Sequence, residues 1–242
     1  MKNKILLLLL IVLFNCPVAS SQDNQAGNNE KSKLSFEIRA DLVSRYIWRG
    51  LPLSLSSNIQ PSLVLTYGNF SFGGWGSYSL SSRYSEADLF LCYDLGLFTL
   101  GLNDYYSEEE TDLSFNDYSD FSNDTPHSIE GTLTFNGTES FPLSFTLGTF
   151  VYGADKDFDD NNYYSTYLEV SYSASINDTD LNFFLGGTPA EGYYSDKAAI
   201  VNLGITASHN LKISESFSLP VGTSFILNPD ANDVFIVLGL TF

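Results

Sequence analysis

The sequence predicts an all-β fold, a transmembrane up-and-down antiparallel β-barrel of about 12 strands over residues 34–242. Three observations predict it. The chain begins with an export signal, no later apolar run is long enough for a membrane helix, and stretches of roughly ten residues alternate between apolar and polar side chains. Gly, Asn, Asp, Pro and Ser separate these stretches, as they do between the strands of a barrel.

Residues 1–21 have the pattern of a secretory signal peptide. Two lysines precede an apolar run over residues 5–14, and a proline and small residues follow, so we place cleavage after Ser21. Cys16 leaves lipid attachment as an alternative, which the bulky Phe14 before it disfavours. Residues 22–33 are polar and unpatterned, and we expect a disordered periplasmic leader. Export and a barrel together predict the outer membrane of a Gram-negative bacterium.

The chain is strongly acidic. It has 11 Lys and Arg against 29 Asp and Glu, and cleavage removes two lysines and no acid, which leaves a net charge near −20. Such a surface repels nucleic acid, so we expect no nucleic-acid partner. Cys92 is the only cysteine beyond the cleavage site, so we expect no cysteine-based metal site and no cofactor.

The first predicted strand runs from Leu34 to Trp48, with an apolar face that a barrel would turn toward lipid. About eleven further segments alternate in the same way. Their apolar faces, in chain order, include Ile59, Leu63 and Leu65; Phe70, Phe72 and Tyr78; Leu89, Leu91 and Tyr93; Phe98, Leu100 and Leu102; Ile129, Leu133 and Phe135; Leu143, Phe145 and Leu147; Tyr164, Leu168 and Val170; Leu181, Phe183 and Leu185; Val201, Leu203 and Ile205; Leu219, Val221 and Phe225; and Val234, Ile236, Leu238, Leu240 and Phe242.

The connections alternate in length, as they do in outer-membrane barrels. If the first strand rises from the periplasm, the odd connections are extracellular and include the long acidic segments 107–127 and 153–162. The even connections include the tight turns 68–69 and 95–96. The pattern favours about twelve strands, and about ten or fourteen are the alternatives because the boundaries within residues 188–228 are blurred.

Aromatic residues gather at the predicted strand ends: Tyr46, Trp48, Tyr105, Tyr106, Tyr152, Tyr163, Tyr164, Tyr193 and Tyr194. Amphipathic rings favour the membrane–water boundary, so this pattern favours an aromatic girdle over the general enrichment of tyrosine in strands. The last strand, Val234 to Phe242, ends on an aromatic residue, which is typical of outer-membrane barrels. We expect the barrel-assembly machinery to recognise Phe242 as part of its signal.

The alternation along the predicted strands places a set of charged side chains in the lumen: Glu37, Arg39, Asp41, Arg45, Glu86, Asp88, Glu130 and Glu169, with Arg49 at the rim. Charges inside a barrel must be paired or hydrated. One interpretation is a salt-bridged network in which Arg39 and Arg45 pair with Glu86, Asp88 or Glu130. A second, compatible interpretation is a charged constriction that selects solutes, and the excess of acids then predicts cation preference.

The loop over residues 153–162 carries Asp155, Asp157, Asp159 and Asp160, in a spacing that places oxygens for a hard cation such as Ca²⁺. It lacks the glycine and the later glutamate of an EF-hand, so a solvated acidic loop is the simpler interpretation. Weak bridging of Mg²⁺ or Ca²⁺ to lipopolysaccharide phosphates is the alternative.

The segment from Ser44 to Gly50 resembles the opening segment of the TorF family of porin-like outer-membrane proteins. Gly73 to Ser77, Glu86 to Asp88 and the tyrosine-rich stretch 163–172 are also similar and follow in the same order, so the resemblance spans nearly all of the mature chain. It implies an outer-membrane barrel with a porin role and no catalytic residues. The acidic loop 107–126 looks like an insertion, so the resemblance implies nothing about its function.

These observations favour an outer-membrane channel for ions or small hydrophilic solutes. The alternative is a non-conducting surface barrel whose acidic loops contact lipopolysaccharide, cations or partner proteins. We do not expect an enzyme, because His127 and His209, the two histidines, fall at opposite ends of the predicted barrel and no Gly-x-Ser-x-Gly motif occurs.

Overall fold

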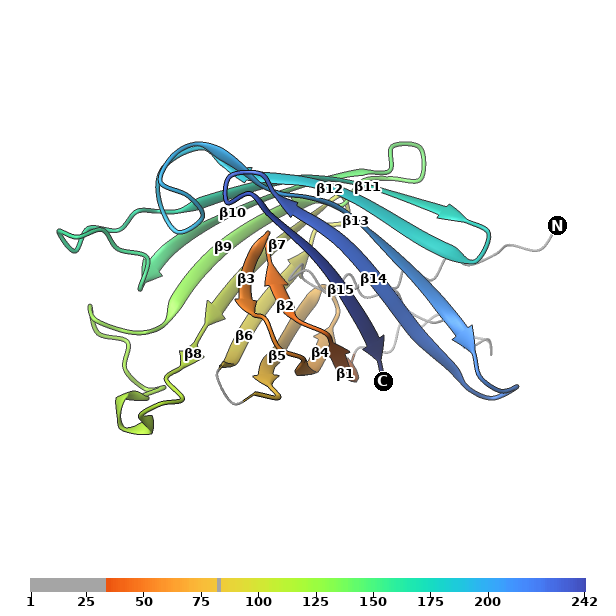
Figure 1. The fold of residues 1–242 in the computed structure, drawn as a ribbon, viewed down its shortest axis with the longest axis horizontal. Coiled ribbons are helices and arrows are strands. Elements are labelled where there is room, and N and C mark those ends of the chain that lie inside the picture. Colours follow the sequence, from red (N-terminus) through yellow and green to blue (C-terminus); the bar gives the residue numbers. More distant parts are fainter. Residues whose placement is uncertain (1–33, 82–83) are drawn as a thin grey trace.

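In the computed structural model, which describes residues 34–81 and 84–242, twelve antiparallel strands form one closed up-and-down barrel (Figure 1). Each strand pairs with the next, and the last pairs with the first to close the sheet. The barrel strands are β1 (Leu34–Val43), β4 (Asn58–Tyr67), β5 (Phe70–Ser79), β6 (Ser85–Asp94), β7 (Phe98–Tyr105), β9 (Ser128–Phe135), β10 (Leu143–Gly153), β11 (Thr166–Ile176), β12 (Thr179–Thr188), β13 (Ala199–Lys212), β14 (Ser218–Asn228) and β15 (Asp233–Thr241). The predicted fold is confirmed with twelve strands. The predicted signal peptide and leader lie outside the described residues.

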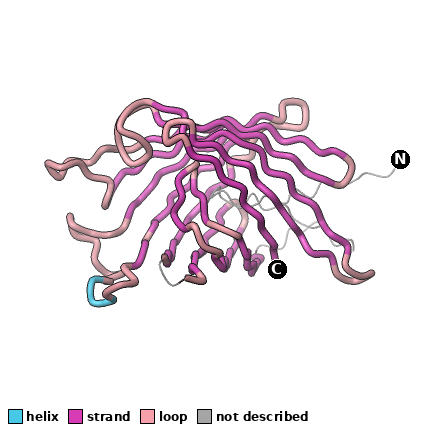
Figure 2. The backbone as a smooth tube through the Cα atoms, viewed as in Figure 1, coloured by secondary structure: helices cyan, strands magenta, loops and turns pink. Residues whose placement is uncertain are grey.

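The other described elements are short. β2 (Tyr46–Trp48) and β3 (Leu51–Ser54) form a separate hairpin, which Figure 1 draws in orange within the curve of the sheet. β8 (Ser107–Glu108) extends the sheet beside β6, and the helical turn η1 (Leu113–Phe115) follows in the same loop, cyan in Figure 2.

The outer face of the barrel is apolar. Leu63, Leu91 and Phe145, on three different strands, are 46, 44 and 46% exposed, and they represent a belt that surrounds the sheet. Soluble proteins rarely expose apolar patches of this extent, and the belt therefore suggests a barrel that sits in a membrane. Over residues 34–81 and 84–242, no helix is both long and apolar enough to cross a membrane.

The connections differ between the two ends of the barrel. The long segments 106–127 and 154–165 lie at one end, which we call the loop end, and the tight turns 68–69, 95–97 and 177–178 lie at the other, the turn end. In Figure 2 the longer loops, drawn in pink, extend beyond the magenta strands. The predicted alternation of long and short connections is confirmed.

The first strand ends earlier than predicted. β1 stops at Val43, and the chain bends at Ser44, whose backbone N–H donates to the carbonyl oxygen of Leu238 at 2.8 Å. The Oγ of Ser44 accepts the N–H of Leu238 at 2.9 Å, so this residue completes the pairing of β1 with β15. Beyond it the chain leaves the wall, and β2 and β3 fold into the lumen instead of continuing the strand.

Val201 also lies on the opposite face from the one predicted. Gly186 pairs with Asn202 and Gly187 with Ile200, so β13 carries one extra residue at this point. Such a bulge shifts the alternation of side chains. It turns both Val201 and Asn202 inward, where they are 0 and 1% exposed, while Ile200 faces outward.

The apolar belt predicts how the barrel responds to charge. The substitution Leu91→Lys places a cation on the outer face, and we expect it to lower the free energy of unfolding by about 2–4 kcal/mol in lipid vesicles. The matched substitution Ser173→Lys, on the half-buried inner face of β11, should cost less than about 1 kcal/mol, because water hydrates the ammonium group there. Urea titration of the vesicle-folded protein measures both values, and equal losses would contradict a lipid-facing outer surface.

Candidate functional site

The hairpin in the lumen turns at Arg49 and Gly50, whose φ angles of 50° and 80° are both positive, as in a type I′ turn. Such turns match the twist of a hairpin and normally carry Asn-Gly. Glycine is required at the second position, because a Cβ on Gly50 would lie 1.9 Å from the carbonyl oxygen of Val201. At the first position a long side chain costs about 1–2 kcal/mol of backbone strain, which the contacts of Arg49 offset.

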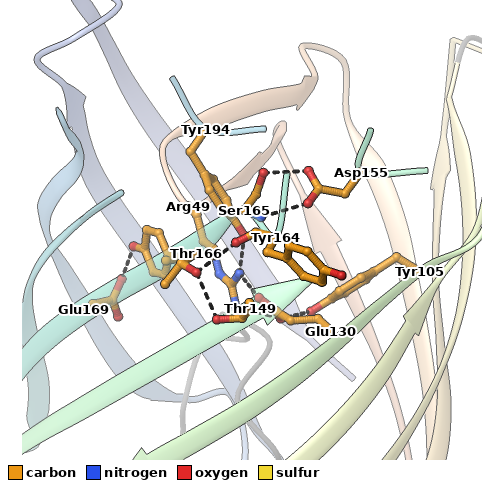
Figure 3. A network of polar contacts seen from close by, with 11 residues as sticks. Arg49, Tyr105, Glu130, Thr149, Asp155, Tyr164, Ser165, Thr166, Glu169 and Tyr194 are labelled. Carbon is orange, nitrogen blue, oxygen red and sulfur yellow. Dashed lines mark hydrogen bonds and ion pairs between the residues drawn. The ribbon is translucent and has the colours of Figure 1, made fainter. Parts of the chain in front are cut away.

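Arg49 is the centre of a buried polar network (Figure 3). Its Nη2 donates to Oε2 of Glu130 at 3.0 Å, and its Nη1 donates to Oε1 of the same carboxylate and to the Tyr194 hydroxyl. The hydroxyl of Tyr105 donates to Oε2 of Glu130 at 2.8 Å. Arg49 is 5% exposed and Glu130 is 0% exposed, so this is a fully desolvated, bidentate ion pair.

Aromatic rings cover the guanidinium group. Its Cζ lies 4.5 Å from the ring centroid of Trp48, 4.6 Å from that of Tyr167 and 5.7 Å from that of Tyr194. A cation over aromatic faces is stabilised by the ring quadrupoles, more strongly where water is excluded. We call the residues that surround the guanidinium group the arginine cage: Trp48, Tyr105, Glu130, Tyr167 and Tyr194.

Two glycines of the wall make room for the arginine cage. A Cβ on Gly148 would lie 2.3 Å from Oε1 of Glu130 and 3.1 Å from Nη2 of Arg49. A Cβ on Gly186 would lie 2.0 Å from the hydroxyl of Tyr167. A larger residue at either position would therefore displace a cage side chain.

The hairpin packs on the wall at both of its sides. On one side, the ring centroid of Trp48 lies 5.4 Å from that of Tyr105 and 6.4 Å from that of Phe150. On the other side, Ile47 packs with Phe184, Ile226 and Phe235, which come from β12, β14 and β15. All of these side chains are at most 8% exposed, so the hairpin is buried between two apolar clusters of the wall.

Below the hairpin, toward the turn end, the inner wall on β9, β10 and β11 is polar and half-buried. Hydroxyl groups pair across neighbouring strands, as Thr134 does with Thr146 at 3.2 Å and Ser144 with Ser171 at 2.7 Å. These four side chains are half-buried, in contrast to the fully buried residues beside the hairpin. The loop-end half of the lumen thus holds the buried hairpin, and the turn-end half has hydroxyl groups on β9, β10 and β11.

The predicted lumen charges divide between these two halves. Glu130 and Glu169 lie at the cage level, where Glu169 accepts hydrogen bonds from Tyr167 and from Asn202. Glu86 and Asp88 lie on β6, each at most 4% exposed. Glu86 accepts a hydrogen bond from the Tyr84 hydroxyl at 2.7 Å, and Asp88 accepts one from the backbone N–H of Tyr106 at 3.1 Å.

The remaining predicted charges lie on β1 and at its bend. Arg39 forms an ion pair with Glu37, and Asp41 accepts a hydrogen bond from Thr241. Arg45 lies at the bend before β2. The interpretation that Arg39 and Arg45 pair with Glu86, Asp88 or Glu130 is wrong. Arg39 pairs with Glu37, and the inward hairpin brings Arg49 from its predicted rim position to Glu130.

The predicted aromatic girdle is wrong for five of its nine residues. Tyr46, Trp48, Tyr105, Tyr106 and Tyr194 are at most 8% exposed and pack inside the barrel. The hairpin carries the first two inward, Tyr105 and Tyr194 pack against it, and Tyr106 packs on Tyr118 and His127 of the long loop. Of the other residues, Tyr152, Tyr164 and Tyr193 are exposed, at 38, 57 and 49%.

His127 anchors the longest loop. Its Nδ1 lies 2.7 Å from Oδ1 of Asp104, its Nε2 lies 3.0 Å from the carbonyl oxygen of Tyr118, and its ring stacks on Phe121 with centroids 4.2 Å apart. The imidazole is 0% exposed, so both ring nitrogens are committed to loop contacts. His209 lies at the turn end, where its Nδ1 contacts the carbonyl oxygen of Asp178.

The four aspartates of the candidate cation loop do not converge. Asp155 is buried and accepts hydrogen bonds from the N–H and the hydroxyl of Ser165. Asp157 accepts the backbone N–H groups of Asn161 and Asp159, and these bonds, that of Asn161 first, hold its pKa below the usual range. Asp159 and Asp160 contribute to the same turn. Within the described ranges no three His, Cys, Asp or Glu residues group closely enough to hold a metal ion.

Comparison with known proteins gives no match, either to a family model or to a curated sequence. The class of the protein therefore follows from its structure alone: a twelve-stranded antiparallel barrel with an apolar exterior, of the kind that membranes accommodate. The alternation of side chains along the strands correctly predicted that Glu130 faces the lumen, but it placed Arg49 at the rim. The signal that could have found it is a two-residue Arg-Gly turn between apolar and aromatic residues, which is the pattern of a hairpin.

The buried pair predicts a large effect of a small substitution. Glu130→Gln preserves the shape of the side chain and removes its charge, so Arg49 stays buried without a counter-ion. We expect the free energy of unfolding to fall by about 3–5 kcal/mol. The same change at the exposed Glu139 should alter it by less than about 0.5 kcal/mol. Denaturant titration of the two variants measures both free energies of unfolding. Equally small changes in the two variants would mean that the ion pair does not hold the hairpin.

Proposed function

We propose that this protein is an outer-membrane channel for ions and small hydrophilic solutes, closed at its loop end by the β2–β3 hairpin. One observation supports the proposal above all: among the described residues, the hairpin lies inside the barrel between two buried clusters of the wall, while hydroxyl groups on β9, β10 and β11 stay half-buried below it. Twelve strands enclose more space than the eight of a packed barrel and less than the sixteen of a wide porin. Removal of the hairpin from such a barrel would leave a narrow passage.

The proposed location is the outer membrane of a Gram-negative bacterium, with the loop end extracellular. The exposed apolar belt, the long acidic loops at one end and the expected signal peptide support it, and so does the resemblance to the TorF family. Phe242 pairs through its backbone with Ala40 of β1, at 2.9 and 3.1 Å, so the last residue takes part in closing the barrel. In the proposed setting it serves the assembly machinery, and the barrel contacts lipid and lipopolysaccharide.

We further propose that the channel prefers cations. Among the predicted lumen residues, acidic side chains outnumber basic ones, and Arg49 is already neutralised by Glu130. A lumen with excess negative charge raises the local concentration of cations and repels anions.

A second function has its own support. The layer formed by Phe150, Tyr167 and Val201 around the hairpin is at most 3% exposed, as dry as a protein core. A barrel that never opens would serve instead as a surface protein whose acidic loops contact lipopolysaccharide, cations or partner proteins. We propose no enzymatic role for either version, because both nitrogens of His127 are engaged in holding a loop.

Conductance separates the two functions. The substitution Arg49→Asn removes the guanidinium group and keeps a residue that type I′ turns favour, so the hairpin itself persists. In planar bilayers we expect the open probability to rise at least about tenfold, because 1.4 kcal/mol of lost contact suffices for that change. The current should reverse at a potential of cationic sign in asymmetric salt.

The control is Lys197→Asn, which removes a positive charge from a loop residue whose side chain is 74% exposed. It should conduct like the wild type. A folded Arg49→Asn barrel that conducts no more than this control would reject the channel and favour the non-conducting barrel, and an anionic reversal potential would reject cation preference alone.

A further inference from the structure

We infer that the arginine cage is a binding site for guanidinium compounds, and that the chain's own Arg49 occupies it in the closed state. We also infer that the channel conducts such a compound, and this part of the inference rests on the proposed function. The inference comes from where the cage residues are attached, from the chemistry of the cage and from the strained turn that carries Arg49.

Most of the cage belongs to the wall. Tyr105 is on β7, Glu130 on β9 and Tyr167 on β11, and Tyr194 lies in the connection between β12 and β13. Only Trp48 comes from the hairpin. The site therefore survives when the hairpin withdraws, with its carboxylate and three aromatic rings in place and a space where the guanidinium group lay.

The cage is suited to a guanidinium group above other cations. Glu130 accepts two parallel hydrogen bonds from Arg49, a geometry that a planar fork of N–H donors provides and an ammonium group does not. The rings of Trp48 and Tyr167 lie 4.5 and 4.6 Å from the guanidinium carbon, within the range for stacking on a flat cation. Because Glu130 is fully buried, a neutral or anionic ligand would leave its charge uncompensated.

Two features make Arg49 a displaceable occupant. Its φ of 50° is an uncommon conformation for a long side chain, and a turn that opens after Arg49 has left the cage releases that strain. A tethered group competes at an effective concentration in the millimolar range, so a free guanidinium compound at a similar concentration can replace it. Replacement keeps Glu130 paired at every stage, whereas withdrawal of Arg49 alone would leave a bare buried carboxylate. Opening of the hairpin is thereby coupled to the arrival of a cation.

Chemical rescue tests the site directly. The substitution Arg49→Gly removes the side chain beyond Cα and suits the positive φ at this position. Propylguanidinium restores the deleted atoms, and propylurea is its neutral counterpart. In the detergent-folded variant, we expect saturable binding of propylguanidinium, followed by tryptophan fluorescence and by a rise in the unfolding temperature, and at least about tenfold weaker binding of propylurea.

The controls separate the site from general effects. The double variant Arg49→Gly with Glu130→Gln should lose the preference for propylguanidinium, and the wild type should bind it more weakly than Arg49→Gly because its site is filled. Equal binding of the charged and neutral compounds, or binding that persists without the Glu130 charge, would overturn the inference. Bilayer recording of Arg49→Gly then tests the channel by itself. Binding without conductance would uphold the site and reject the channel, whereas conductance without binding would do the reverse.

Discussion

The position of the hairpin depends on one contact, the buried ion pair between Arg49 and Glu130. The pair fixes how deep the hairpin reaches, because both oxygens of the carboxylate are engaged by the guanidinium group. Once the turn is placed, Trp48 meets the aromatic wall and Ile47 meets the apolar patch on the opposite side. Asn228 adds a hydrogen bond from its side chain to the carbonyl oxygen of Gly50 at 3.2 Å. These contacts together hold the hairpin inside the barrel.

The wall is adapted to receive the hairpin. Gly148 and Gly186 leave space for the cage, and the bulge in β13 turns Val201 inward so that its backbone lies against Gly50. A strict alternation along β13 would have placed this valine on the outer face, where it would add little to a belt that is already apolar. The local departures from regular strand geometry thus coincide with the place where the hairpin docks, as expected where a barrel builds a site.

The fold could be predicted from the sequence because its signal is repeated along the whole chain. Each strand alternates, and a misjudged residue such as Val201 leaves the others intact. The site could not be predicted in the same way, since it depends on a single event, the bend at Ser44. Residues 34–42 alternate strictly, and Tyr46 and Trp48 keep the same register, so the sequence is compatible with one long strand. Val43 and Ser44 break the alternation, but only the pairing of Ser44 with Leu238 at the seam shows that the wall ends there. One long strand would place Tyr46, Trp48 and Arg49 at the rim, whereas the bend places them in the centre of the lumen.

The chemistry of the closing contact bears on whether the hairpin is permanent. A buried ion pair contributes little net stability compared with apolar side chains of the same size, because the desolvation of both charges offsets their attraction. A plug whose only role was structural would therefore be more stable with leucine or phenylalanine at positions 49 and 130, next to the aromatic side chains already present. The ion pair instead fixes one position of the hairpin. Separating Arg49 from Glu130 is costly unless another cation binds to the carboxylate. This is the property expected of a contact that is exchanged, and it is why we favour a channel with an occupied cation site over an inert barrel.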